Sequence, residues 1–225
     1  MSLFCLVHGS AQAPSGWDLL IPQLKKLGHE TVCVDLPTDK PEARAAQYAQ
    51  VIGESLKNSK EAAIAVATSA SGMFLPFVPQ YADIERIVFL AAVVPESGKS
   101  MMERFQAHPE MFNPDWVGKD PTRDPEVPKR FLFHDCDPDV AEWALTTLRL
   151  TYARAAMMEP CSLQRWPAVP STYILCREDR TINPEWWRRE AERLLGVVPL
   201  ELPGGHCPHV SRPAELAAVL SALDR

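Results

Sequence analysis

The sequence predicts an α/β fold, with a mainly parallel sheet flanked by helices and a helical cap inserted after the fourth strand. Three observations lead to this expectation. Short apolar strands alternate with helices at both ends of the chain, the strands are apolar along most of their length, and the alternation stops in the middle of the chain. Such alternation is typical of parallel sheets with right-handed crossovers, whose strands are covered on both faces. We therefore expect one core, formed by residues 1–94 and 169–225, and a helical cap, formed by residues 95–168.

Six buried strands are expected where short apolar or β-branched runs are bounded by glycine, proline or polar residues. Residues 87–94, IVFLAAVV, form the longest uninterrupted apolar run, as a strand covered on both faces should. The six expected strands cover residues 3–9, 31–37, 62–68, 84–94, 171–176 and 197–202.

Helices are expected from leucine spacing and from capping residues. Leu20, Leu24 and Leu27 recur at helical spacing. Asp39 is an expected N-cap, and Asn183 precedes another helix. The expected core helices cover residues 17–27, 39–59, 70–81, 183–195 and 212–225.

The segment of residues 95–168 has a different composition. Prolines are frequent, and five of the seven methionines fall here together with several aromatic residues. One clear helix begins at Asp137, with Pro138 in its first turn. The sequence leaves open whether the methionines and aromatics seat this cap on the core or line an apolar pocket.

The composition excludes several classes of protein. The chain has 225 residues, of which 46% are hydrophobic and 23% charged, with a net charge of −6 and a pI near 5.5. This acidic balance argues against nucleic acid or an anionic membrane as the main partner. The apolar runs are too short to span a bilayer, and the start, MSLFCLVHGS, lacks the form of a signal peptide. Six cysteines without a C-x-x-C pair indicate free thiols, so we expect a cytoplasmic protein.

Ser69 is the candidate nucleophile. It lies in A-T-S-A-S-G, directly after an expected strand and before an expected helix. A serine on a sharp strand-to-helix turn needs small residues two positions before and after it, because the backbone passes close to its neighbours there. Ala67 and Ser71 meet this requirement, although glycine is usual at both positions. Ser71 is the rival nucleophile, but Met73, two positions after it, is not small.

A serine nucleophile needs a base that is oriented by a carboxylate. His206 follows an expected strand in a loop that contains Gly204 and Gly205, and Asp179 follows the preceding strand. Parallel sheets build their sites at the carboxyl edge of the strands. We therefore expect Asp179 and His206 to lie at the same edge as Ser69.

Other assignments of the polar residues remain open from the sequence. Glu178 is a second candidate acid, and Asp179 is also placed to pair with a neighbouring arginine in solvent. His206 and His209 form H-C-P-H, but no second ligand set accompanies them, so we expect no metal site and a structural role for His209. His134 belongs to a segment that we expect to cap a helix.

The loop after the first strand contains candidate donors for an oxyanion hole. A tetrahedral intermediate of acyl transfer needs two preorganised N–H groups. We expect one from Ser10, which follows His8 and Gly9, and one from Ala70, which follows the candidate nucleophile.

The chain resembles the α/β-hydrolase superfamily in the stretches LVHGS, LIPQLKKLGHETVCVDLP, ATSASG, YILCREDRTINPEWWR and PGGHCPHVSRPAEL. It is most similar to the small carboxylesterases that include plant methyl esterases, hydroxynitrile lyases and bacterial relatives, and FHDCDPDVAEWALTTLR resembles the cap of bacterial members. The resemblance implies Ser69 as nucleophile, His206 as general base and Asp179 as the acid that orients it. It also implies Ser10 and Ala70 as the oxyanion donors.

Two positions depart from the family pattern. Thr68 stands where histidine is common before the serine, and Ser71 stands where glycine is usual. These departures bear on the rate and on the shape of the pocket more than on the type of chemistry.

The expected function is a serine hydrolase that cleaves a small, hydrophobic carboxylic ester through an acyl-enzyme, without a metal or organic cofactor. The expected partner is a small-molecule ester, not nucleic acid or a membrane, and the sequence is compatible with a homodimer. Two alternatives remain, an inactive ligand-binding protein on the same scaffold and a hydroxynitrile lyase. In that group of lyases a lysine typically follows the catalytic histidine, where this chain has Cys207.

Overall fold

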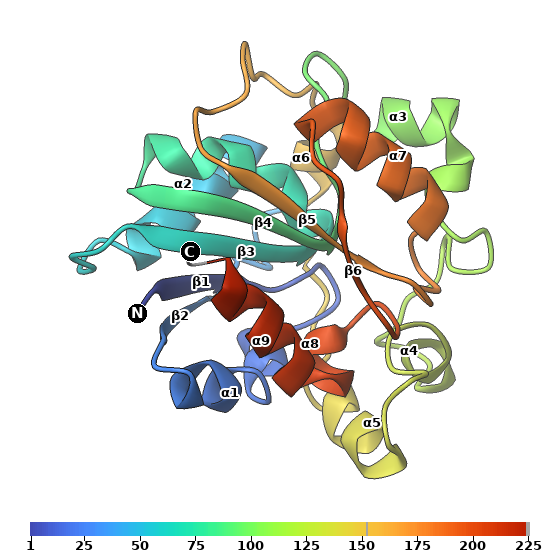
Figure 1. Ribbon diagram of the computed structural model, residues 1–225. Helices are drawn as coiled ribbons and strands as arrows, with labels where there is room; N and C mark the ends of the chain where they lie inside the picture. Colours follow the sequence, from blue (N-terminus) through green and yellow to red (C-terminus); the bar gives the residue numbers. More distant parts are fainter. Residues whose placement is uncertain (152, 224–225) are drawn as a thin grey trace.

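A six-stranded parallel sheet forms the centre of the protein (Figure 1). The structure is a computed structural model, and it describes residues 1–151 and 153–223. The strand order is β2-β1-β3-β4-β5-β6, and every neighbouring pair is parallel, which confirms the expected α/β fold. Each strand overlaps one of the six expected runs. They are β1 (Leu3–Val7), β2 (Glu30–Val34), β3 (Ala63–Ser69), β4 (Ile84–Ala92), β5 (Ser171–Cys176) and β6 (Leu200–Leu202).

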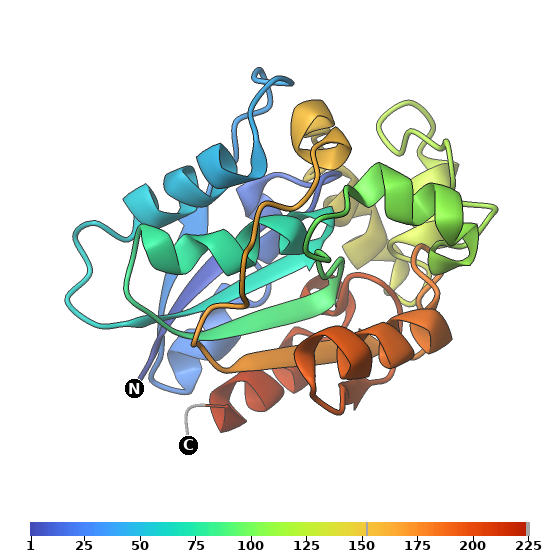
Figure 2. The same cartoon turned by 90° about the horizontal axis from the view of Figure 1, so that it is seen from above.

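Helices cover both faces of the sheet, as the apolar strands require (Figure 2). Successive strand residues point to opposite faces. In β1, Leu3 and Cys5 belong to one buried cluster and Phe4 and Leu6 to the other. The helices are α1 (Ile21–Lys26) and α9 (Pro213–Ala222) on one face, and α2 (Ala45–Ser55), η2 (Ala70–Gln80) and α7 (Pro184–Leu195) on the other.

Two of the expected helices differ from the observed ones because of prolines. The expected helix at residues 70–81 is the 3₁₀ helix η2, which contains Pro76 and Pro79. Proline has no N–H for an α-helical hydrogen bond and clashes with the preceding turn. The expected helix at residues 17–27 is divided into the 3₁₀ helix η1 (Pro14–Trp17) and α1, whose first turn contains a proline.

The helix expected at residues 39–59 begins later than predicted, at Ala45. Its first turn is stabilised by a residue far away in the sequence, because the Ala45 N–H donates to Glu159 Oε1 at 2.6 Å. Asp39 is therefore not the N-cap. At the other end of the chain, α9 corresponds to the helix expected at residues 212–225. Residues 224 and 225 of that prediction lie outside the described residues.

The segment between β4 and β5 lies at the carboxyl ends of the strands (Figures 1 and 2). Its helices are short. They are α3 (Met101–Ala107), the 3₁₀ helix η3 (Pro109–Met111), α4 (Glu126–Phe131), α5 (Pro138–Leu145) and α6 (Arg154–Met158). A short helix, α8 (Pro208–Ser211), precedes α9. Among residues 1–151 and 153–223, no helix has the length and apolar character needed to cross a membrane.

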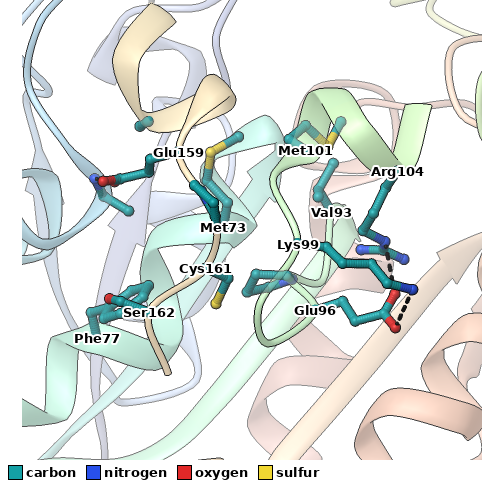
Figure 3. A pocket seen from close by; sticks show the side chains of 14 residues that line it. Met73, Phe77, Val93, Glu96, Lys99, Met101, Arg104, Glu159, Cys161 and Ser162 are labelled. Carbon is teal, nitrogen blue, oxygen red and sulfur yellow. Dashed lines mark hydrogen bonds and ion pairs between the residues drawn. The ribbon is translucent and has the colours of Figure 1, made fainter. Parts of the chain in front are cut away.

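Arg104 on α3 attaches this segment to the core. Its guanidinium, with a side chain only 2% exposed, lies 3.3 Å from Glu96 and 2.8 Å from Glu190, and it also donates to the Val94 carbonyl. Figure 3 shows Arg104 and Lys99 meeting at Glu96, beside a small pocket. A buried ion pair contributes little net stability, but the loss of one partner leaves an uncompensated buried charge.

Replacement of Arg104 is therefore expected to destabilise the protein more than replacement of Arg193, which pairs with the same two carboxylates but is 50% exposed. We expect Arg104→Met to lower the free energy of unfolding by about 3 kcal/mol, and Arg193→Met by about 1 kcal/mol or less. Urea denaturation of both variants measures the difference. Equal losses would show that the burial of Arg104 has no energetic importance.

Candidate active site

Ser69 occupies a strained turn between β3 and η2. Its backbone has φ 57° and ψ −137°, a conformation that residues other than glycine rarely adopt. Two glycines allow the close packing of this turn. A Cβ at Gly72 would lie 2.3 Å from the Val93 carbonyl oxygen, and a Cβ at Gly9 would lie 3.0 Å from the Ser69 Cβ. The Ser69 side chain is thereby presented to a cavity at the carboxyl edge of the sheet.

The rival serine, Ser71, has a different environment. It is buried, and its hydroxyl donates to the His8 carbonyl at 2.7 Å. Of the two serines, only Ser69 lines the cavity that contains His206. The geometry therefore favours Ser69 as the nucleophile and gives Ser71 a role in holding the turn against the loop after β1.

His206 and Asp179 form a buried pair. His206 Nδ1 lies 2.7 Å from Asp179 Oδ2, and both side chains are almost completely buried. Thr181 completes the arrangement, because its hydroxyl donates to Asp179 Oδ1 at 2.9 Å and its oxygen lies 2.7 Å from His206 Nδ1. The hydrogen on Nδ1 is thus directed at the acid, which leaves Nε2 available to act as a base.

The loop after β5 fixes the orientation of the Asp179 carboxylate. Oδ1 accepts backbone N–H groups from Thr181, at 2.7 Å, and from Ile182, at 3.1 Å. The other candidate acid, Glu178, points elsewhere and accepts the N–H of Gly204. The carboxylate that contacts His206 is therefore that of Asp179.

Two residues of the inserted segment fasten the loops that carry this pair. His134 Nε2 lies 3.0 Å from the Glu178 carbonyl oxygen, and the Gly205 N–H donates to Asp135 Oδ2 at 2.9 Å. Asp137 is the N-cap residue of α5, as expected, but the contacts of His134 and Asp135 were not foreseen. No local pattern could have revealed them, because their partners lie in loops far along the chain.

The loop after β1 is held by His8, which is buried. His8 Nε2 accepts the N–H of Leu36 at 3.1 Å, and Nδ1 lies 2.8 Å from the Gly9 carbonyl oxygen. Burial lowers the pKa of His8, so it stays neutral and keeps both hydrogen bonds. The Thr151 N–H donates to the Ser10 carbonyl at 2.7 Å and holds the same loop from the inserted segment.

The two expected oxyanion donors lie beside Ser69. Ser10 and Ala70 both line its cavity. Ala70 is the first residue of η2, where an N–H has no partner within the helix. In the described part of the chain, the Ser10 N–H has no hydrogen-bond acceptor. Both N–H groups are therefore available to a substrate oxygen.

One cavity of about 170 Å³ brings together four of the five expected site residues, and Asp179 lies directly behind His206. No hydrogen bond joins Ser69 and His206 within residues 1–151 and 153–223. Such contacts are often long in enzymes without bound substrate. The core also contributes Thr68, Cys207 and the loop after β1 to the wall of this cavity. The inserted segment contributes five apolar side chains, namely Met101, Phe112, Trp116, Leu132 and Met157.

His209 has a structural position. Its Nε2 donates to Gln12 Oε1 at 2.9 Å, and its ring packs on Trp17 with centroids 4.4 Å apart. Complete burial, together with the nearby His206, lowers the pKa of His209 to about 3. In the part of the chain that the structure describes, no group of three or more His, Cys, Asp or Glu side chains is arranged to hold a metal ion.

The buried, neutral His209 predicts a loss of stability in acid. Its pKa in the folded protein lies below that of an unfolded histidine, so the unfolded chain binds more protons as the pH falls from the ordinary value of about 6.5 toward 3. Between pH 7 and pH 5, this group should lower the free energy of unfolding by about 2 kcal/mol. His8 adds a loss in the same direction.

Urea denaturation at both pH values tests the assignment. His209→Gln should make stability less dependent on pH, whereas the control His108→Gln, at an exposed position, should leave the dependence as it is in the wild type. An unchanged dependence in His209→Gln would show that His209 is not a buried neutral group.

Comparisons with known proteins agree with this architecture. Residues 6–219 match the model of the family described as "Alpha/beta hydrolase family". Salicylic acid-binding protein 2 of Nicotiana tabacum is 26% identical over 253 aligned positions, which cover 96% of this chain and 95% of that protein. Methylesterase 1 of Arabidopsis thaliana is 24% identical, over 95% of this chain and 92% of that protein.

Solved structures show the same fold. The crystal structure of polyneuridine aldehyde esterase superposes with a TM-score of 0.82 at 22% identity and covers 100% of both chains. A pyrethroid hydrolase from Sphingobium faniae gives a TM-score of 0.76 at 16% identity, over 99% of this chain and 96% of that one. Because the family match extends from β1 to α9, the chain belongs to the α/β hydrolase family.

Proposed function

We propose that this protein is a carboxylic ester hydrolase that works through an acyl-enzyme on Ser69. One observation carries the proposal: a serine on a strained strand-to-helix turn shares a cavity with a histidine whose other nitrogen is bound to a buried carboxylate. Serine, base and acid in this relation form the constellation used for acyl transfer on several unrelated folds.

In the first step, Ser69 Oγ attacks the ester carbonyl carbon while His206 Nε2 takes the hydroxyl proton. Asp179 and Thr181 hold the imidazole through Nδ1, and the negative charge of Asp179 stabilises the imidazolium that forms. The carbonyl oxygen becomes an oxyanion, which accepts the N–H groups of Ser10 and Ala70.

The tetrahedral intermediate then collapses. The bond from the carbonyl carbon to the alcohol oxygen breaks, and His206 gives its proton to the departing alcohol. Water, deprotonated by His206, attacks the resulting ester on Ser69 and releases the carboxylic acid. These steps need no metal or organic cofactor.

We also propose that residues 95–168 act as a cap that shapes the substrate pocket. The apolar side chains of the cap, among them Phe112, Trp116 and Met157, face Ser69 across the cavity. Such a wall favours a hydrophobic acyl or alcohol group. The relatives named methylesterase and polyneuridine aldehyde esterase support an ester substrate.

The lyase alternative has less support from the site. The residue after His206 is Cys207, which is buried, and its thiol lies 3.8 Å from Gln12 Oε1. The ammonium that hydroxynitrile lyases of this group typically place here is replaced by a neutral thiol. The alternative of an inactive ligand-binding protein is tested by measuring whether the wild type turns over any ester.

Stopped-flow hydrolysis of short p-nitrophenyl esters, combined with intact-protein mass measurement, tests the nucleophile. We expect the wild type to form an acyl adduct, and Ser69→Ala to lose the adduct and about three orders of magnitude or more in kcat. Ser71→Ala is the matched control and should keep the adduct, because Ser71 donates to a backbone carbonyl. Undiminished turnover in Ser69→Ala would move the nucleophile elsewhere, and wild-type binding without turnover of any ester would favour the ligand-binding alternative.

Thr181 is expected to act as a positioning residue for His206. Thr181→Val keeps the shape but removes the hydroxyl that contacts both members of the pair, so kcat should fall about tenfold. Thr181→Ser should restore most of the rate. The pH profile of kcat/KM in both variants separates loss of histidine orientation from loss of folding. Equal rates in the valine and serine variants would show that the hydroxyl has no role.

A further inference from the structure

The cavity of Ser69 adjoins two further cavities, and the three share a common wall. The two neighbours have volumes of about 280 Å³ and about 200 Å³. Trp116 and Met157 line all three cavities, so they separate two branches that lead away from Ser69. The first branch is lined by Met102, Phe105 and Val117, and the second by Phe74, Leu150 and Ala153.

Lys119 is the one side chain of fixed charge in this system, among the described residues that line the three cavities. It borders both branches but not the central cavity, so it lies away from the ester-cleaving end. Apart from the titratable His206, the other lining residues are apolar or carry neutral polar groups. Lys119 is an exposed residue, so its ammonium lies at the solvent end of the two branches, where its effect on binding is modest and depends on salt.

The two acidic residues nearest to Lys119 in the chain are already paired with arginines. Arg130 lies 2.8 Å from Asp115, and Arg123 lies 3.0 Å from Asp120. Within residues 1–151 and 153–223, the Lys119 ammonium has no ion-pair partner. An unpaired cation at the end of an otherwise neutral pocket is a binding group for an anion.

A tight turn keeps Lys119 beside the dividing wall. The Lys119 N–H donates to the Trp116 carbonyl at 3.0 Å, and Gly118 between them has φ 78°, which favours glycine. The Trp116 ring in turn packs on Phe131, with centroids 5.6 Å apart. The backbone that carries the ammonium is thus fixed relative to the two branches.

We propose that the substrate is an ester that carries a carboxylate at the end distant from the ester bond, and that Lys119 binds this carboxylate. This inference rests on the proposed ester hydrolysis. The apolar middle of such a molecule would fill one branch, while its reacting carbonyl lies at Ser69. A carboxylate fits better than a phosphate, because the single ammonium of Lys119 balances one negative charge.

The test compares two series of mono-p-nitrophenyl esters, made from dicarboxylic acids of increasing chain length and from the corresponding terminal amides. The amides have the same shape without the charge. We expect the wild type to favour the acids by about two- to fivefold in kcat/KM at the best chain length, with the preference falling as salt is added. Lys119→Met should abolish the preference, and Lys119→Glu should reverse it.

Lys60→Met is the matched control. Lys60 is exposed and lies before β3, at the opposite edge of the sheet, so the same change of net charge should leave the preference intact. Binding of the two ester series to Ser69→Ala measures the preference without turnover, which separates this proposal from the proposed chemistry. No preference in the wild type, its persistence in Lys119→Met, or an equal loss in Lys60→Met would each overturn the proposal.

Discussion

The site depends on one strained turn, at Ser69. A positive φ at a residue with a side chain costs free energy, so the surrounding structure must hold it in place. Gly72 allows the chain to pass against the end of β4, and Gly9 allows the loop after β1 to approach the serine. The Val93 N–H donates to the Ser69 carbonyl at 2.9 Å. The tight packing of three strand ends therefore positions the serine.

The inserted segment holds the site together as well as covering it. Thr151 binds the loop after β1, while His134 and Asp135 bind the two loops that carry Asp179 and His206. The segment is itself fixed to the core by the buried Arg104 and by Glu159. Its contacts reach three of the loops that carry site residues, so a change in this segment should affect the geometry of catalysis as well as the pocket.

Charge is distributed unevenly over the molecule. His8 and His209 are buried beside the site, and burial lowers the pKa of both, so they stay neutral. Each contributes to the structure through its packing and its hydrogen bonds. Among the residues that the structure describes, Asp179 is the one buried carboxylate, and it accepts hydrogen bonds from two backbone N–H groups, a hydroxyl and the imidazole of His206. The mainly apolar side chains that line the cavity would strengthen the electrostatic interactions that develop in the proposed acyl transfer.

The sequence by itself determined the fold and the places of the candidate site residues. Apolar periodicity and turn residues are local signals, and they located all six strands and the strand ends at which Ser69, Asp179 and His206 lie. Only the tertiary structure decided which neighbouring polar group faces the site. The side chains of Ser71 and Glu178 form hydrogen bonds with backbone groups, whereas the hydroxyl of Thr181 contacts His206.

Tertiary contacts also determined where α2 begins and which loops His134 and Asp135 bind. In each case the partner lies far along the chain. A hydrogen bond between distant residues leaves no periodic pattern in the sequence, and it forms only when packing brings the two groups together.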